Sequence, residues 1–367
     1  GFLSFITSRY WIEAEFAAKL RQYISENYEI REILDFSNAV IFEQGIKVAI
    51  TSIAKRRISD HTLRFMSYVG KKFVGLQNDK LEISLVRDST LLSSDNRWIF
   101  VESSGSDLLA KISKNSVPLD DIAFCKQGIV TGRDRAFIFE AKAPLSELKN
   151  SLIKPWLKVG DVHRYSILPV KRRFLVYTND IDEISNYPSF HDWLRTHSEK
   201  LKTRREVRNG KIRWFDLQWP REKRFFDNEK LICRFKAERN TFAYDDYGFY
   251  CSADITLVLI KEEFRTKYSI KYVLALLNSR LSEYHFRTYA KLMDYRYEYY
   301  PTPVSLLRIC PANPPQQKPF ITLVDQILTA KKKDLNTDTS ALENQIDEMV
   351  YKLYGLTEDE IKIIENK

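Results

Sequence analysis

The residues best suited to bind a ligand form one basic run near the middle of the chain. Between residues 194 and 224, eleven Lys or Arg stand against four Asp or Glu, so this stretch carries most of the chain's net charge of +9. Lys and Arg neutralise phosphates, and Arg also binds guanine edges through two hydrogen bonds. The cations to which we assign a DNA-binding role are Lys200, Lys202, Arg204, Arg205, Arg208, Lys211 and Arg213.

Aromatic residues accompany this basic run. Trp193, Trp214, Phe215 and Trp219 are placed either to stack on bases or to fill a core. The alternative interpretation of the run is a solvated cationic face. Seven net positive charges so close together repel one another without an anionic partner, and this favours contact with a nucleic acid.

A second candidate is the segment 128–134 (GIVTGRD), which lies between two apolar stretches. Two glycines four residues apart let the backbone approach another surface closely. Thr131 and Arg133 offer a hydroxyl and a guanidinium, both common phosphate partners. The alternative is a hairpin turn that joins strands at 122–124 and 136–139 and contacts nothing. We predict a turn that faces DNA.

The sequence contains no complete catalytic motif. Residues 313–316 (NPPQ) look like the N-P-P-[YFW] motif of amino-methyltransferases, but the fourth residue is Gln and the segment is rich in proline, so we interpret the match as a coincidence. The four cysteines form no C-x-x-C pair, which argues against a metal site and against disulfides. Reduced thiols fit a cytoplasmic protein. No apolar run reaches the roughly 18 residues needed to cross a membrane.

Hydrophobic periodicity indicates the elements that must position these residues. Residues 2–7 are predicted as a buried strand, 12–26 as a helix and 30–36 as a second strand. Residues 40–42 and 47–53 are predicted as two strands joined by a turn at Gln44-Gly45. This order is typical of one edge of an α/β sheet. Further helices are predicted near 108–114, 145–150, 187–203 and 269–290. Two more are predicted after residue 319, followed by a final short helix that starts at Thr357. The first of the two has an apolar stripe of Phe320, Leu323, Val324, Ile327 and Leu328.

Taken together, these segments resemble the gamma-class N6-adenine DNA methyltransferases of Eco57I-like type II (IIG) restriction–modification systems, which end in a TaqI-like specificity domain. The most specific cue for that domain is the segment 128–132 followed by Ala136-Phe137. Residues 1–54 resemble the part of the methyltransferase domain that follows the catalytic loop. Supporting cues are Lys154-Pro155, Gly160-Asp161-Val162, Arg164-Tyr165, Trp214-Phe215, Leu276-Leu277-Asn278-Ser279 and Leu353-Tyr354-Gly355-Leu356-Thr357.

The resemblance implies a fold in three segments. Residues 1–75 would be an α/β remnant of a Rossmann-like methyltransferase sheet, residues 76–310 an α+β target-recognition domain, and residues 311–367 a C-terminal helical tail. It also implies double-stranded DNA as the partner, S-adenosylmethionine as the methyl donor of the parent enzyme, and N6-methylation of a flipped adenine. Phe42 matches an aromatic that packs on that adenine; the alternative is a core position in the predicted hairpin.

Two motifs of that family are missing from the sequence, the F-x-G-x-G donor loop and the N-P-P-[YF] loop. We therefore expect a fragment, or one subunit of a split enzyme, that binds no S-adenosylmethionine alone and works with a separate methyltransferase or nuclease part. Two other functions stay open: a non-catalytic type I-like specificity subunit, and a fragment of an RNA-modifying enzyme. Type I-like subunits usually carry two recognition domains. Here one recognition region follows a piece of α/β sheet, which favours the methyltransferase.

Overall fold

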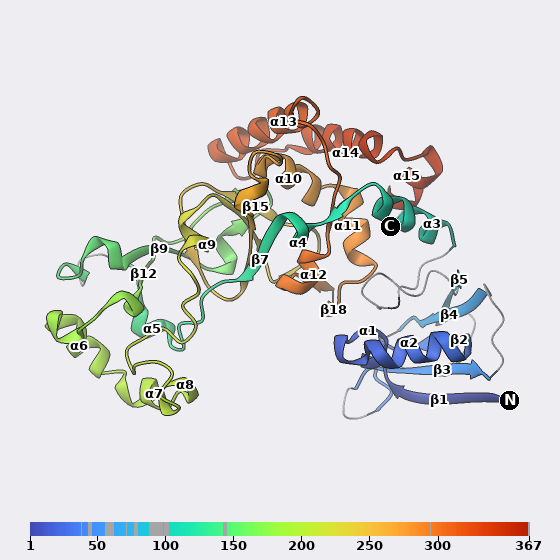
Figure 1. The fold of residues 1–367 in the computed structure, drawn as a ribbon, viewed down its shortest axis with the longest axis horizontal. Helices are drawn as coiled ribbons and strands as arrows, with labels where there is room; N and C mark the ends of the chain where they lie inside the picture. Colours follow the sequence, from blue (N-terminus) through green and yellow to red (C-terminus); the bar gives the residue numbers. More distant parts are fainter. Residues whose placement is uncertain are drawn as a thin grey trace. The chain divides into compact units, whose positions relative to one another are not determined.

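The computed structural model describes residues 1–37, 39–42, 46–55, 62–70, 72–76, 80–87, 98, 103–141, 145–293 and 295–365. The chain forms two compact units (Figure 1): unit 1 comprises Gly1–Lys114 and Thr357–Lys367, and unit 2 comprises Asn115–Leu356. Their limits differ from those of the three predicted segments, since residues 76–114 belong to unit 1 and residues 311–356 to unit 2. The functional division at residues 75 and 310 stays a prediction.

Unit 1 is built on a mixed five-stranded sheet in the order β1-β3-β2-β4-β5. β2 and β4 run parallel, and the other neighbouring strands are antiparallel. Ile30, Ile33 and Leu63 are fully buried in its core. The bounds of the strands are β1 Phe2–Ser8, β2 Glu29–Asp35, β3 Val48–Ala54, β4 Thr62–Tyr68 and β5 Leu81–Arg87. The helices are α1 Tyr10–Glu13, α2 Ala18–Asn27, α3 Ser103–Lys114 and α15 Glu358–Glu365.

The structure corrects three expectations for unit 1. β1 is a strand, but it is not buried: it pairs with β3 at the edge of the sheet and leaves Phe2 79% exposed. The predicted helix 12–26 is divided into α1 and α2 by an extended Ala14 and a 3-10 turn at Glu15–Ala17, and the buried Arg21 donates to the carbonyls of Trp11 and Ala14 at this break. The segment 40–42 makes a single bridge from Val40 to Lys72 rather than a strand. The predicted turn at Gln44-Gly45 lies outside the described residues.

Unit 2 contains two four-stranded sheets in the orders β15-β13-β17-β7 and β16-β9-β12-β8. Side chains from both sheets meet in one core, which includes Trp156, Leu175 and Leu257. The first sheet comprises β7 Ala123–Gln127, β13 Lys230–Arg234, β15 Phe242–Asp245 and β17 Ile255–Ile260. The second comprises β8 Ile138–Phe139, β9 Ile153–Leu157, β12 Phe174–Val176 and β16 Tyr250–Cys251.

Three smaller sheets complete the strands of unit 2. They are formed by β6 Val117–Pro118 with β20 Arg308–Ile309, by β10 Val162–His163 with β11 Ser166–Ile167, and by β14 Lys236–Ala237, β19 Arg296–Glu298 and β18 Leu292–Met293. The mixed α/β character with several sheets agrees with the expected fold class. The Rossmann-like origin of unit 1 stays a prediction.

Most helices of unit 2 are short, and α13 is the longest described. The predicted helix at 145–150 is wrong, since the described residues there form turns and 3-10 structure, including a 3-10 turn at Asn150–Leu152. In α13 the predicted apolar stripe is confirmed, with Phe320, Leu323, Val324 and Ile327 buried. The helices are α4 Leu119–Ile122, α5 Asp134–Phe137, α6 Pro188–Arg195, α7 Ser198–Lys202, α8 Arg205–Arg208, α9 Arg224–Asp227, α10 Ile270–Leu277, α11 Arg280–Arg287, α12 Pro301–Ser305, α13 Pro314–Lys333 and α14 Ser340–Tyr354.

Candidate nucleic-acid interface

The glycine-containing segment 128–133 connects separate parts of unit 2 and does not form the hairpin turn considered as the alternative. β7, which precedes it, pairs with β17, whereas β8, which follows it, pairs with β12 in the other sheet. Between these strands, the amide of Ile129 donates to the carbonyl of Cys251 over 2.8 Å. Val130 and Trp219 exchange two backbone hydrogen bonds of 3.2 and 2.9 Å. The segment is therefore held in place by distant strands and loops.

Both glycines are required by close packing, as their spacing predicted, but the surface they approach is the protein itself. A Cβ atom on Gly128 would lie 2.2 Å from the carbonyl oxygen of Ser252 and 2.6 Å from that of Cys251. Gly132 has φ +79°, in the left-handed region that favours glycine, and a Cβ atom there would lie 2.8 Å from Cδ of Arg204. The glycines thus fix the backbone on both sides of Thr131 and next to Arg133.

Replacing Gly128 by Ala should destabilise unit 2 by about 2 kcal/mol or more, because the clashing atoms are backbone carbonyls that cannot rotate away. Urea denaturation followed by tryptophan fluorescence would measure the change. The matched control is Gly160→Ala, since a Cβ atom on Gly160 meets nothing within 4 Å. Equal stability of the two variants would contradict the close approach described above.

Thr131 and Arg133 have different surroundings. The hydroxyl of the buried Thr131 donates to Asp134 over 2.7 Å and accepts the amide of Arg133 over 3.2 Å, so this side chain closes the turn. Arg133 is half-buried, and its Nε donates to Nδ1 of His197 over 3.4 Å. Burial, together with the nearby charges of Arg133 and Arg135, lowers the pKa of His197. A neutral His197 can accept this bond, which connects the turn to the basic run.

The first half of the basic run lies in the end of α6 and in α7 and α8, and these helices lie together at one end of unit 2 (Figure 1). α6 begins at Pro188, whose fixed φ suits the first position of a helix. Phe190 and Leu194 of α6 and Leu201 of α7 are buried against the core, so the polar residues between them face outward. This amphipathic spacing is what exposes the cations.

Arg204 has a structural role, unlike the exposed cations of the run. Its side chain is only 8% exposed. The guanidinium donates to the carbonyls of Leu201 (2.9 Å), Thr131 (3.3 Å), Asp216 (2.9 Å) and Trp214 (2.8 Å). It therefore connects α7, the 128–133 segment and the 214–216 segment. With its donors committed to the fold, Arg204 is not available to bind a phosphate, and we withdraw the DNA-binding role that the sequence suggested for it.

Arg213 is also engaged within the fold. Its guanidinium makes a salt bridge with Asp216, with a shortest distance of 2.7 Å, and donates to the carbonyl of Ile181 over 2.6 Å. It also lies 4.4 Å from the ring centre of Phe215. Its side chain is 40% exposed, so one edge remains accessible. The contacts indicate that Arg213 holds the 181–182 loop to the basic run, and any DNA contact would be additional.

The remaining predicted cations are exposed. Lys200, Arg208 and Lys211 make no ion pair with an acid in the described part of the chain. Arg205 has a long ion pair of 3.5 Å with Glu206 and stays 81% exposed. Lys202 lies 5.7 Å from the ring centre of Trp214. We define the basic surface as these five exposed residues: Lys200, Lys202, Arg205, Arg208 and Lys211.

Tryptophan side chains lie in the same region. Trp193 is 41% exposed, although its indole donates to the carbonyl of Ala136 over 3.1 Å and its ring packs edge-on against His197. Trp219 is 42% exposed and has Arg221 over its ring. Phe215 is buried and belongs to the core, so of the four predicted aromatics it is the one least able to stack on a base. Fixed, partly exposed indoles beside cations are suited to contact nucleotides.

One cation of this region escaped the sequence reasoning. Arg135 of α5 is exposed, and its charge acts on His197 together with that of Arg133. The signal that could have found it is its place directly after the glycine-containing segment, two residues after Arg133. Arg135 extends the positive surface from α7 toward α5.

Two other sequence candidates lie elsewhere. Phe42 is 44% exposed in a loop of unit 1, so it is not the core residue of the alternative interpretation, and its stacking on adenine stays a prediction. Asn313 caps α13: its amide oxygen accepts the backbone N–H of Gln316 over 3.0 Å, and the Gln316 side chain accepts that of Asn313 over 2.9 Å. The NPPQ segment is therefore a helix start.

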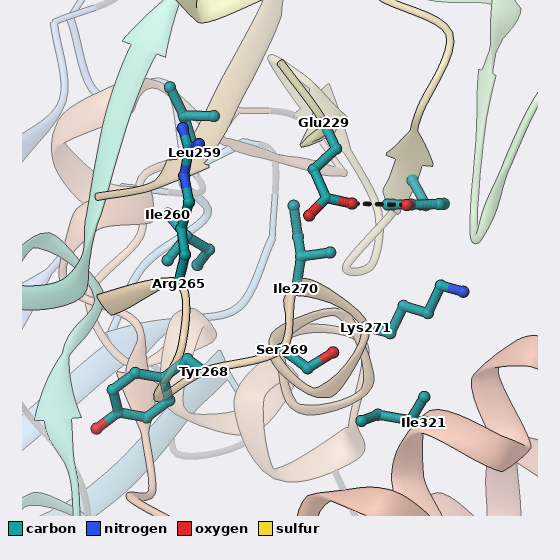
Figure 2. Close-up of a pocket in the computed structure, with 10 residues that line it drawn as sticks. Glu229, Leu259, Ile260, Arg265, Tyr268, Ser269, Ile270, Lys271 and Ile321 are labelled. Carbon is teal, nitrogen blue, oxygen red and sulfur yellow. Dashed lines mark hydrogen bonds between the residues drawn. The ribbon is translucent and has the colours of Figure 1, made fainter. Parts of the chain in front are cut away.

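A surface cavity of about 400 Å³ lies apart from these residues, between β17, the start of α10 and α13 (Figure 2). Its polar groups are largely paired with each other or with neighbours. Tyr244 donates to Glu229 over 2.7 Å, and Lys271 makes a salt bridge of 2.6 Å with Asp325. Burial and the Glu229 carboxylate raise the pKa of Tyr244. Because these polar side chains already bind one another or neighbouring residues, we do not assign a ligand to the cavity.

Within the described residues, no group of three His, Cys, Asp or Glu side chains is arranged to hold a metal. The same residues contain no helix that is both long and apolar enough to cross a membrane.

Residues 154–301 match the family of the TaqI-like C-terminal specificity domain. Among curated proteins, the chain is 23% identical over 397 residues to the type II methyltransferase M.BstVI of Geobacillus stearothermophilus, covering 100% of this chain and 66% of that protein. It is 22% identical to the type II methyltransferase M.BanIII of Aneurinibacillus aneurinilyticus, covering 97% and 68%. The chain thus spans about two thirds of the length of these relatives.

Among solved structures, the fold is similar to that of the type IIL restriction–modification enzyme MmeI, which was determined in complex with DNA. The TM-score is 0.63 at 12% identity, and the match covers 100% of this chain and 49% of that one. At this identity the similarity concerns the fold. The basic surface lies within the range that matches the specificity domain.

Proposed function

We propose that this chain, which carries a TaqI-like C-terminal specificity domain, recognises double-stranded DNA for a restriction–modification N6-adenine methyltransferase. The observation that carries the proposal is the basic surface: five exposed cations and two fixed, partly exposed tryptophans fall inside that domain. Lys and Arg on such a surface neutralise backbone phosphates, which supplies affinity and orients the protein. The bases are then read by groups that reach their edges.

The proposal extends to the parent enzyme. There, S-adenosylmethionine would supply the methyl group to an adenine flipped out of the duplex. We expect that the residues of this chain alone do not form the site for that donor, because the sequence has neither the F-x-G-x-G nor the N-P-P-[YF] motif and Asn313 is a helix cap. We therefore assign no chemical step to this chain. Its part is recognition, and we propose that Phe42 of unit 1, which is exposed, stacks on the flipped base.

Selection from a randomised pool of double-stranded DNA should enrich one short sequence motif when the full chain is the bait. Specific protein–DNA complexes bind roughly 10³- to 10⁷-fold more tightly than non-specific ones, so the enriched duplex should outcompete a scrambled one clearly. Structured RNA of equal length is the second competitor. Absence of any enriched motif would contradict sequence recognition, and stronger competition by RNA than by duplex DNA would assign the surface to RNA.

A further inference from the structure

Exposed aromatic and basic residues also gather at the tip of a small hairpin in unit 2, which lies within the specificity domain but outside the basic surface. β18 and β19 form this hairpin, and β14 pairs along its outer side. Tyr295 at the turn is 62% exposed, and Met293 is 40% exposed. Arg296 is exposed as well, with its guanidinium 5.1 Å from the ring centre of Tyr295. Asp294, between Met293 and Tyr295, lies outside the described residues.

The base of the hairpin is held rigidly. Tyr299, just after β19, is 1% exposed and stacks on Phe286 at 4.2 Å with an interplanar angle of 14°. Its hydroxyl donates to Asn240 over 2.9 Å, and its carbonyl accepts the hydroxyl of Thr256 over 2.7 Å. A tip that projects from such an anchor keeps its geometry when it meets a partner.

The charged side chains described at the tip are cations. Lys236 of β14 lies beside Met293, with 3.2 Å between Nζ and the sulfur, and neither Lys236 nor Arg296 makes an ion pair with a described acid. Lys291, at the start of the hairpin, does make one, with Glu298 at 3.6 Å. Lys236 and Arg296 therefore have no described carboxylate partner, and they lie beside the exposed ring of Tyr295. Such a group can bind a nucleic acid, whose phosphates attract the cations and whose bases stack on the ring.

We propose that the β18–β19 hairpin is a second DNA-contacting element, in which Tyr295 packs against a base and Arg296 and Lys236 contact the neighbouring phosphates. This inference rests on the proposed function. Figure 1 shows β18 well apart from α6, α7 and α8 within unit 2, so the hairpin and the basic surface contact different stretches of the duplex. Side chains of other DNA-binding proteins are known to insert between neighbouring bases from a groove.

The test uses the full chain and the duplex enriched by the selection described above. Tyr295→Ala should weaken binding roughly 5- to 150-fold, the range found for removing an aromatic that stacks on a base. Tyr295→Phe keeps the ring and should bind within about twofold of the unaltered chain. Because Tyr295 is exposed, the melting temperature should not change in either variant. Arg296→Ala should lower the slope of log K against log salt by about 0.9.

The matched control is Tyr247→Ala, which removes another exposed tyrosine (66%) of unit 2 from a turn outside the hairpin. If Tyr295→Ala binds the duplex as well as Tyr247→Ala does, the hairpin is not a DNA contact and the inference is wrong, while the proposed function stands. That outcome would also be expected if the tip docks on a protein. If the unaltered chain enriches no duplex, the proposed function fails and takes this inference with it.

Discussion

Replacing Arg204 by Ala is expected to lower the free energy of unfolding of unit 2 by about 3–5 kcal/mol. The guanidinium donates to four carbonyls that belong to three separate segments of the chain. Its removal leaves buried carbonyls without their charged donor and opens a gap beside Gly132, whose missing Cβ makes room for the Arg204 side chain. Such losses lie at the upper end of what one substitution causes.

The neighbouring Arg205 supplies the matched control. Both residues are arginines next to each other in sequence, yet the Arg205 side chain is 81% exposed and has only a long ion pair with Glu206. Arg205→Ala should therefore change stability by no more than about 0.5 kcal/mol. Urea denaturation of the two variants measures the difference. Similar stabilities would show that the buried hydrogen bonds of Arg204 are not what holds the segments together.

Arg204→Lys separates charge from geometry. A lysine keeps the positive charge, but its single ammonium cannot reach carbonyls on three segments at once as the planar guanidinium does. We expect the lysine variant to recover less than half of the stability lost in Arg204→Ala. Full recovery would mean that the charge alone matters at this position.

Arg204 also shows where sequence reasoning stops. The sequence established that residues 200–213 are strongly basic, and the structure places most of these cations on the surface of short helices as amphipathic spacing predicts. The sequence alone could not distinguish the buried Arg204 from the exposed Arg205. The difference depends on carbonyls at Thr131 and in the 214–216 segment, and these come close to Arg204 only in the folded chain.

The same limit applies to the glycine-containing segment. The spacing of two glycines four residues apart correctly predicted a close approach of the backbone. The structure shows that Gly128 approaches the carbonyls of Cys251 and Ser252. The partners of the flanking strands were not predictable from local pattern, because β7 and β8 pair with strands of two different sheets. By contrast, the apolar stripe of α13 follows from helical periodicity alone, since each buried residue lies on one face of a single long helix.

The largest expected effect on binding comes from removing three cations of the basic surface together. Lys200, Arg208 and Lys211 are exposed and make no ion pair with a described acid, so their charge is available to phosphates. Each phosphate contact that is lost should flatten the slope of log K against log salt by about 0.9. Replacing all three by Ala should therefore change the slope by up to about 2.7 and weaken duplex binding roughly 10- to 100-fold at moderate salt.

The control for this variant removes the same charge from another surface. Lys318, Lys332 and Lys333 are exposed lysines of α13, and replacing them by Ala also lowers the net charge by three. If the basic surface binds DNA through local contacts, only the first variant loses the salt slope. If the whole positive field of the protein attracts DNA without a defined surface, both variants lose affinity to the same extent. Fluorescence anisotropy with the selected duplex across a range of salt concentrations distinguishes the two outcomes, and equal losses would remove the basic surface from the proposed function.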